Sequence, residues 1–354
     1  MKLLYIAMKY DYGDSRRGHS FEHNNFYDSL LKMDKGRHEI IYFPFDEIMN
    51  TIGREEMNKK LLETVYNEKP NLSFFFLFTD EITKETIKEI TDKSGSITFN
   101  WFADDHWRFD IFSKYWAPFF HWVSTTDSKA PEKYYKSGYK NIIKTQWACN
   151  HFLYKSTNGG DFKHDVSFVG QPHSNRKQMA AKLSKNGINV ECWGKGWPNG
   201  RISQDKMVEI FSTSRINLNL PKASNYLNIK SVGKIFLSRR SNGEFTINNP
   251  KLWKDNFKFL LGNQREQIKG RNFEIPGCGG FLLTGDADNL SDYYKDGEEI
   301  VIFKNDQDMI EKIKYYLAHE DKRKKIANAG HKRTLKDHTY EERFREIFKI
   351  VKII

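Results

Sequence analysis

The densest group of chemically capable side chains lies between Glu266 and Leu283. Lys269 and Arg271 place two cations shortly before the carboxylate of Glu274, and a glycine-rich turn and an apolar run follow. Cations beside the amides of a turn suit a diphosphate, and a carboxylate can accept both hydroxyls of a ribose. The segment therefore predicts a nucleotide site. The spacing equally permits a plain ion pair between Arg271 and Glu274 at i, i+3 of a helix.

A second candidate begins where the apolar run Val166–Val169 ends. Gly170 closes this run, and a polar loop leads through Ser174 or Asn175, the expected helix cap, to Arg176. In doubly wound sheets, phosphates bind where a strand ends in glycine and a capped helix begins. Arg176 is thus expected either to contact a phosphate or to pair only with a neighbour.

Short apolar runs alternate with amphipathic stretches along most of the chain, and this pattern predicts parallel, doubly wound α/β sheets. The expected strands are Leu3–Ala7, Glu39–Phe43, Leu72–Phe78, Ile97–Trp101, Trp122–Ser124, Ile142–Thr145, Val166–Gly170, Val190–Trp193, Ile216–Leu220, Gly280–Leu283 and Ile300–Phe303. The expected helices include Ser20–Lys32, Glu55–Asn67, Lys129–Lys136, Arg176–Lys185 and one that begins at Asp306. A linker-like cluster, Ser156–Asp161, interrupts the alternation. We therefore expect Rossmann-like domains at residues 1–160 and 161–338, followed by a helix at 339–354.

Composition narrows the class of protein. A chain of 354 residues suits about two domains, and an aromatic share of 15% excludes a disordered chain. No apolar run reaches membrane-spanning length, and the N-terminus resembles a first core strand rather than a signal peptide. The three cysteines form no C-x-x-C pair, which argues against a zinc site and suits a reducing cytoplasm. The net charge of +11 favours an anionic partner (nucleotide, nucleic acid or membrane surface) or reflects a solvated lysine-rich surface.

The C-terminal half resembles a known family. Residues 271–283 fit the pattern R-x-F-E-x-x-x-C-G-x-F-L-L, and Glu299–Phe303, Asp306–Leu317 and His338–Phe344 follow in the order found in CgeB-like glycosyltransferases. The resemblance extends from about Asp165 to the C-terminus. It implies the GT-B fold, in which two Rossmann-like domains face a cleft and a last helix crosses back to the N-terminal domain.

The resemblance also implies roles for individual residues. Glu274 is expected to bind the ribose of a nucleotide sugar, and Lys269 with Arg271 to neutralise its diphosphate without a metal. Glu266 and Glu274 have the E-x7-E spacing of retaining GT-B enzymes. Gly170, Arg176 and Gly279 complete the expected donor-binding set.

The N-terminal half offers candidates for the acceptor side. His19 or His23 could act as a base whose tautomer is held by Asp104 or Asp105, and the alternative is a pair of histidines in a polar surface loop. Such a base belongs to inverting enzymes and conflicts with the retaining E-x7-E pattern. Asp104, Asp105 and His106 could also hold a metal, but no further ligand is identifiable, so we prefer aspartates that contact the acceptor or the transferred sugar.

These observations predict a metal-independent, cytoplasmic glycosyltransferase of a bacterium or a phage-infected host. It would use a nucleotide sugar, expected to be a UDP-sugar, need no other cofactor and act on a glycan by default. One alternative is glycosylation of hydroxymethylated bases in phage DNA, since a net charge of +11 permits electrostatic binding of the DNA phosphates. Another is a non-catalytic nucleotide-binding protein of the same fold. The sugar, the acceptor, the stereochemical outcome and the oligomeric state are left open.

Overall fold

The computed structural model describes residues 1–156, 161–173, 175–220, 233, 235–248, 250, 253–254, 257 and 266–353. The chain forms two compact units. Unit 1 consists of Met1–Gln146, Leu227–Asn263 and Glu341–Ile354, and unit 2 of Trp147–Tyr226 and Gln264–Tyr340. Among the described residues, no helix is long and apolar enough to span a membrane.

The division between the units differs from the expected boundary after residue 160, because the chain enters unit 2 at Trp147. The backbone amide of Cys149 donates to His338 O at 2.9 Å, and Tyr340 N donates to Cys149 O at 3.0 Å. These bonds hold the segment that follows Gln146 against the end of the last helix of unit 2. A long-range pairing of this kind leaves no local signal in the sequence.

Unit 1 contains a six-stranded parallel sheet in the order β2-β1-β3-β4-β5-β6. Its strands are β1 (Lys2–Ala7), β2 (Glu39–Pro44), β3 (Leu72–Phe75), β4 (Ile97–Phe102), β5 (Trp122–Thr125) and β6 (Ile142–Lys144). Its helices are α1 (Asp28–Lys32), α2 (Phe45–Glu68), α3 (Lys84–Lys93), α4 (Asp105–Arg108), α5 (Lys114–Trp116), α6 (Ala130–Lys136) and α14 (Tyr340–Ile350). The chain reverses direction across the sheet between β1 and β3, and ligands of such sheets bind at the carboxyl ends beside this switch point.

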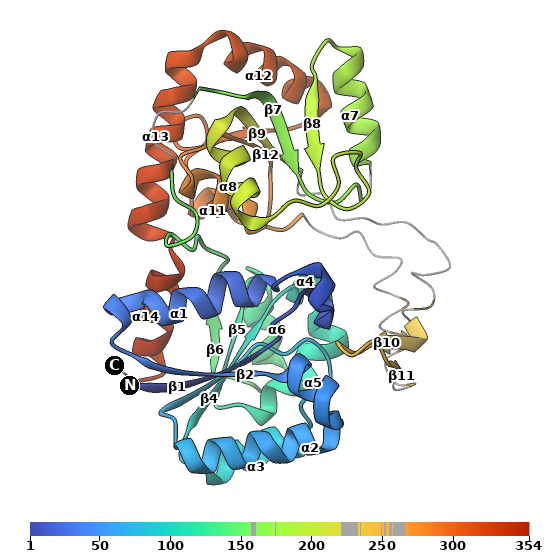
Figure 1. Ribbon diagram of the computed structural model, residues 1–354, viewed down its shortest axis with the longest axis vertical. Helices are drawn as coiled ribbons and strands as arrows, with labels where there is room; N and C mark the ends of the chain where they lie inside the picture. Colours follow the sequence, from blue (N-terminus) through green and yellow to red (C-terminus); the bar gives the residue numbers. More distant parts are fainter. Residues whose placement is uncertain are drawn as a thin grey trace. The chain divides into compact units, whose positions relative to one another are not determined.

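Both faces of this sheet are covered (Figure 1): α2 and α3 lie on one face, and α1 and α14 on the other. Alternating side chains of β1 fill the two cores, because Leu4 and Ile6 join the cluster under α2 and α3 while Tyr5 packs against Phe74 at 5.4 Å between ring centroids. On that second face, Phe344 of α14 contacts Phe74 at 5.7 Å. The C-terminal helix therefore forms part of the core of unit 1.

Unit 2 contains a five-stranded parallel sheet in the order β13-β12-β9-β7-β8, with its switch point between β7 and β9. The strands are β7 (His164–Val169), β8 (Val190–Trp193), β9 (Ser214–Asn219), β12 (Leu282–Gly285) and β13 (Val301–Phe303). The helices are α7 (Arg176–Lys185), α8 (Gln204–Thr213), α11 (Arg271–Gly277), α12 (Asp306–Ala318) and α13 (Glu320–Asp337). Side chains of α7 and α12 pack in one core, and those of α8 and α11 in the other.

The predicted class, two doubly wound parallel α/β sheets, is confirmed. The helix predicted at Glu55–Asn67 begins ten residues earlier, at Phe45, and Gly53 with φ +81° interrupts its geometry. This interruption explains why the amphipathic pattern revealed only the second half. The helix predicted at Ser20–Lys32 is irregular, with a π-helical turn at His23–Tyr27 before α1.

Candidate functional site

Arg176 lies at the switch point of unit 2, where β7 and β9 end. Its Nη1 donates to Gln171 O at 2.8 Å, and its Nη2 donates to Leu220 O at 2.6 Å. The guanidinium thus connects the loops that follow the two central strands. Of the two expectations for Arg176, these bonds agree with pairing with neighbouring protein groups. Asn175 precedes α7 without a side-chain cap bond, and Ser174 lies outside the described residues.

Gly170 allows two loops to approach closely at the same edge. Its amide donates to Trp193 O at 2.9 Å, and its carbonyl accepts from Trp197 Nε1 at 2.8 Å. A Cβ on the neighbouring Gly194 would lie 2.4 Å from that carbonyl oxygen. Gly170 is therefore part of a tightly packed support for the switch point.

A buried polar network fixes α11 to the ends of two strands. Asn219, the last residue of β9, donates through Nδ2 to Asn272 Oδ1 at 3.0 Å and to Thr284 Oγ1 at 3.2 Å. Asn272 Oδ1 also accepts from the amide of Lys269 at 2.9 Å. The carboxyl ends of β9 and β12 thereby position the helix that carries the predicted nucleotide ligands. Sequence analysis did not identify Asn219. The signal that could have found it is a polar asparagine at the end of an apolar strand.

Glu274 has no exposed surface and forms an ion pair with Arg271. Arg271 Nη1 donates to Glu274 Oε2, so the i, i+3 pairing is present. The other carboxylate oxygen, Oε1, and Arg271 Nε are buried and have no hydrogen-bond partner among the described residues. Buried polar atoms almost always have a partner, so this pair retains one free acceptor and one free donor for a ligand.

Three other predicted donor residues lie close in sequence to the Arg271–Glu274 pair. Lys269 and Glu266 are both half-buried, and Glu266 O accepts from Asp288 N at 2.9 Å. Gly279 adopts φ +76°, and a Cβ there would lie 3.1 Å from Ser156 Oγ. The geometry of the turn and its packing account for this glycine.

Gly277 offers a test of how tightly α11 is packed. A Cβ on Gly277 would lie 2.2 Å from Cys149 Sγ. We expect Gly277→Ala to lower the free energy of unfolding of unit 2 by about 1–3 kcal/mol through overpacking. Gly233→Ala is the control, because a Cβ there meets no atom of the described residues within 4 Å. Urea titration of both variants measures the difference, and equal stabilities would contradict the packing argument.

In unit 1, the rings of the two predicted histidines lie against each other at an angle of 38°, with ring centroids 4.0 Å apart. His19 is exposed, and burial together with the neighbouring His19 lowers the pKa of His23 to about 4. In the described part of the chain, neither histidine forms a hydrogen bond or ion pair with Asp104 or Asp105. The structure thus does not bring the predicted His–Asp dyad together.

The adjacent aspartates occupy different environments. Asp105 has no exposed surface, and it accepts from Ser113 Oγ at 2.5 Å and Tyr134 Oη at 2.9 Å. Burial raises the pKa of its carboxyl group to about 6. Asp104 keeps exposed surface and adopts φ +60° immediately before α4. A substrate can therefore reach Asp104, whereas Asp105, predicted as a catalytic residue, ties α4 to the interior.

Glu22 and Asp46 lie near the end of β1, and sequence reasoning did not assign either to the site. Asp46 accepts from Lys9 N at 2.8 Å and from Tyr10 N at 3.0 Å, which fixes the loop after β1. Burial raises the pKa of Glu22 to about 7. A carboxyl group that titrates near neutrality beside a switch point is a candidate for proton transfer. No spacing rule distinguishes this glutamate from others in the chain.

Comparison with known proteins adds independent information. Residues 175–349 match the family described as Glycosyl transferase-like. Spore protein CgeB of Bacillus subtilis (strain 168) is 24% identical over 223 residues, which cover 62% of this chain and 64% of CgeB. The alignment thus spans less than two thirds of that relative.

Two solved structures share the fold along nearly the whole chain. Alr3699/HepE of Anabaena, in complex with UDP and glucose, is 10% identical, with a TM-score of 0.58 and coverage of 100% of both chains. Sucrose-phosphate synthase of Thermosynechococcus elongatus is 10% identical, with a TM-score of 0.59 and coverage of 99% of this chain and 98% of that one.

Proposed function

We propose that the chain is a glycosyltransferase of the GT-B type, as its resemblance to CgeB-like glycosyltransferases predicts, and that it transfers a sugar from a UDP-sugar to a glycan acceptor. The observation that carries this proposal is the ion pair between the half-buried Arg271 and the buried Glu274, whose Oε1 has no partner among the described residues. The complex of the Anabaena protein with UDP and glucose supports UDP as the nucleotide, because the two chains share a fold.

In the proposed site, Glu274 Oε1 accepts a hydrogen bond from a ribose hydroxyl of the donor. Arg271 forms an ion pair with Glu274 and, with Lys269, faces the diphosphate. When the bond between sugar and phosphate breaks, negative charge develops on the leaving UDP, and fixed cations stabilise it without reorganising. These two cations therefore take the place of a divalent metal in the proposal.

The acceptor is proposed to bind at unit 1, where the carboxyl ends of β1 and β4 lead to His19 and Asp104. Both side chains have exposed surface that can contact hydroxyl groups. Glu22 lies on the same segment as His19 and is suited to exchange a proton near neutral pH. Asp105 is left out of this set because both of its carboxylate oxygens already accept hydrogen bonds, Oδ1 from Ser113 and Oδ2 from Tyr134. No described residue favours DNA as the acceptor or a non-catalytic role.

Thermal melting with a panel of nucleotide sugars, followed by donor hydrolysis assays with and without EDTA, tests the proposal. We expect one UDP-sugar to raise the melting temperature in proportion to the logarithm of its concentration, as mass action requires. We expect turnover of that donor to persist in EDTA. Failure of every nucleotide sugar to stabilise the protein would contradict the donor site. Loss of turnover in EDTA that Mg²⁺ restores would contradict metal independence alone.

A further inference from the structure

The loop that follows β1, residues 8–19, is fixed by its own polar contacts. Asp11 N donates to Gly18 O at 3.0 Å, and Arg17 Nη2 pairs with Asp11 Oδ2 at 2.8 Å. The carboxylate of Asp46 accepts from two further amides of the loop. The side chains of this loop are therefore presented by a backbone of defined shape.

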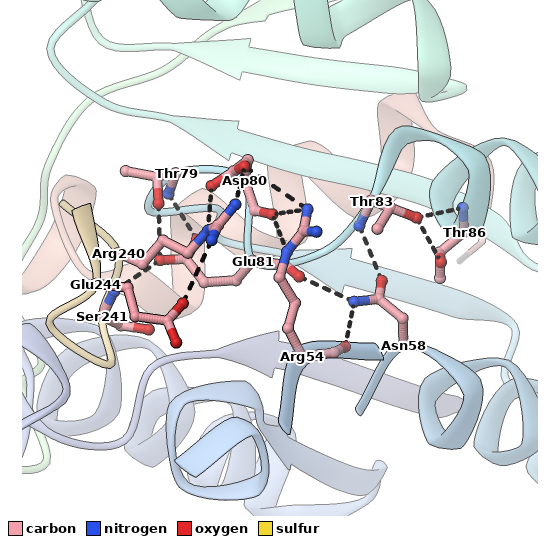
Figure 2. A network of polar contacts seen from close by, with 10 residues as sticks. All are labelled: Arg54, Asn58, Thr79, Asp80, Glu81, Thr83, Thr86, Arg240, Ser241 and Glu244. Carbon is pink, nitrogen blue, oxygen red and sulfur yellow. Dashed lines mark hydrogen bonds and ion pairs between the residues drawn. The ribbon is translucent and has the colours of Figure 1, made fainter. Parts of the chain in front are cut away.

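A hairpin from a distant part of the chain is attached to unit 1 beside this loop (Figure 2). It consists of β10 (Leu237–Arg239) and β11 (Phe245–Ile247), and neither strand was predicted because each is only three residues long. At its turn, Arg240 pairs with Asp80 through two parallel bonds, from Nε to Oδ1 at 2.9 Å and from Nη2 to Oδ2 at 2.8 Å. Bidentate pairing of this kind fixes orientation as well as position.

The turn of the hairpin contacts the loop at Ser241. The amide of Ser241 donates to the buried Glu81 Oε1 at 3.1 Å (Figure 2). A Cβ on Gly13, which adopts φ +70°, would lie 2.2 Å from Ser241 O. This position accepts only glycine, both for its backbone angle and for the space available. The turn therefore holds in place the residue that directly follows Tyr12.

Tyr12 differs from the rest of the loop in its backbone and its exposure. It adopts φ +54° and ψ 31°, a left-handed conformation that is unfavourable for a bulky side chain. It nevertheless keeps 57% of its surface exposed, so burial of the ring does not offset the cost. Backbone strain of this kind is concentrated at sites that bind ligands.

Two side chains orient the ring of Tyr12 and leave much of it accessible. The guanidinium of Arg17 lies over the ring, 4.7 Å from its centroid. Phe78 packs against the ring at an angle of 89°, with centroids 5.8 Å apart. An aromatic ring that is already oriented loses little freedom when a ligand packs on it.

The ring lies near the residues proposed above for the acceptor. Phe78 O accepts from Arg108 Nη2 at 2.6 Å, and Arg108 N donates to Asp104 O at 2.9 Å, so Phe78 connects Tyr12 to the start of α4. Burial of its hydroxyl group raises the pKa of Tyr12, and nearby carboxylates, among them Glu22 and Asp104, raise it further. An oriented aromatic ring and carboxylates therefore occur together in unit 1.

This combination matches the chemistry of a sugar. One face of a pyranose ring carries mainly C–H groups, which pack on an aromatic ring, and its hydroxyl groups donate to carboxylates. A nucleobase would also stack on a tyrosine. However, the phosphates of a nucleic acid would be repelled by the neighbouring carboxylates. The observations therefore favour a glycan.

We propose that Tyr12 binds the acceptor by stacking on one of its sugar rings, while Asp104 accepts hydrogen bonds from hydroxyl groups of the same sugar. This inference rests on the glycan acceptor of the proposed function and names the residue that selects it. The turn at Ser241, through its contact with Gly13, keeps the ring in its orientation.

A matched pair of variants tests the stacking. Binding of the full chain to an array of immobilised oligosaccharides, followed by titration of the strongest glycan in solution, measures the acceptor side, and isothermal titration with UDP measures the donor side. Tyr12→Phe keeps the flat ring and should bind the glycan within about twofold of wild type. Tyr12→Leu keeps the same backbone strain but lacks the ring, and it should bind about tenfold more weakly.

The control is Tyr135→Leu, which removes a tyrosine that is 54% exposed on α6. It should bind the glycan like wild type. The affinity for UDP should be the same in all four proteins, because no substituted residue belongs to unit 2.

Tyr12→Asn separates binding from stability. Asparagine adopts the left-handed conformation more readily than tyrosine, so the melting temperature should be unchanged or higher while glycan binding falls as in Tyr12→Leu. A lower melting temperature together with unchanged glycan binding would assign the ring to the fold and overturn the proposal.

The remaining outcomes distinguish this inference from the proposed function. Equal glycan affinities of wild type and Tyr12→Leu would overturn the stacking alone. Wild-type protein that binds UDP but no glycan on the array would overturn the stacking and the glycan acceptor, and would leave the donor site standing. Wild-type protein that binds neither would contradict the proposed function itself. Binding of a single-stranded oligodeoxynucleotide that is lost in Tyr12→Leu, without binding of any glycan, would assign Tyr12 to a nucleobase instead.

Discussion

Replacing Glu274 with Gln should remove the stabilisation by the UDP-sugar and lower donor turnover by at least about a hundredfold. The substitution keeps the size of the side chain but removes the charge that pairs with Arg271 and one of the two acceptor oxygens. In a glutamine, an NH₂ group takes the place of one of the two carboxylate oxygens. This group donates hydrogen bonds instead of accepting them, so it cannot accept one from a ribose hydroxyl. Isothermal titration with UDP and single-turnover assays with the donor measure the two effects separately.

Loss of the charge also leaves Arg271 without its partner, so part of any defect could come from the fold. Two further variants separate these causes. Lys269→Gln leaves the buried pair intact and should weaken UDP binding while preserving the melting temperature. Glu298→Gln, on an exposed side chain of the same unit, should leave both quantities unchanged. Normal UDP binding by Glu274→Gln would remove Glu274 from the donor site.

The two sheets were predictable because their strands are buried on both faces. Parallel strands covered by helices form continuous apolar runs. Every predicted strand range overlaps an observed strand, and for Val190–Trp193 the predicted and observed bounds are the same. The hairpin at 237–247 did not follow from the sequence, because its strands are short and held by the distant Asp80 and Glu81. The early entry into unit 2 was missed for a similar reason, since it depends on the pairing of Cys149 with Thr339.

The candidate site was predictable in its residue types but not in the exposure of its side chains. The spacing of Arg271 and Glu274 allowed both an ion pair and a ligand site, and the structure shows the pair together with an unpartnered oxygen. Arg176 was identified by its place after a strand, yet its guanidinium is engaged by backbone carbonyls, one of them that of Leu220, 44 residues further along the chain. Which polar side chains turn inward is decided by tertiary packing, and the adjacent Asp104 and Asp105 illustrate this most clearly.

Asp105→Ala should lower the free energy of unfolding of unit 1 by about 3 kcal/mol or more, because it leaves the buried hydroxyls of Ser113 and Tyr134 without their acceptor. Asp104→Ala should change it by less than about 1 kcal/mol, since Asp104 is partly exposed and its side chain caps nothing. Urea titration measures both. Equal losses from the two variants would contradict the assignment of Asp105 to the interior.

The pH dependence of stability gives Asp105 a signature of its own. Its pKa is raised from an ordinary 3.8 to about 6 in the folded protein, so the folded state binds this proton more tightly than the unfolded state does. The resulting stabilisation is complete below about pH 4 and is lost as the pH rises to about 6, with a total of about 3 kcal/mol. Asp105→Asn cannot titrate, so the stability of this variant relative to wild type should rise by up to that amount between pH 4 and pH 7. The contribution of Glu22 cancels in this difference because both proteins contain it. A difference that stays constant across this range would mean that Asp105 titrates in the folded protein as it does in the unfolded chain.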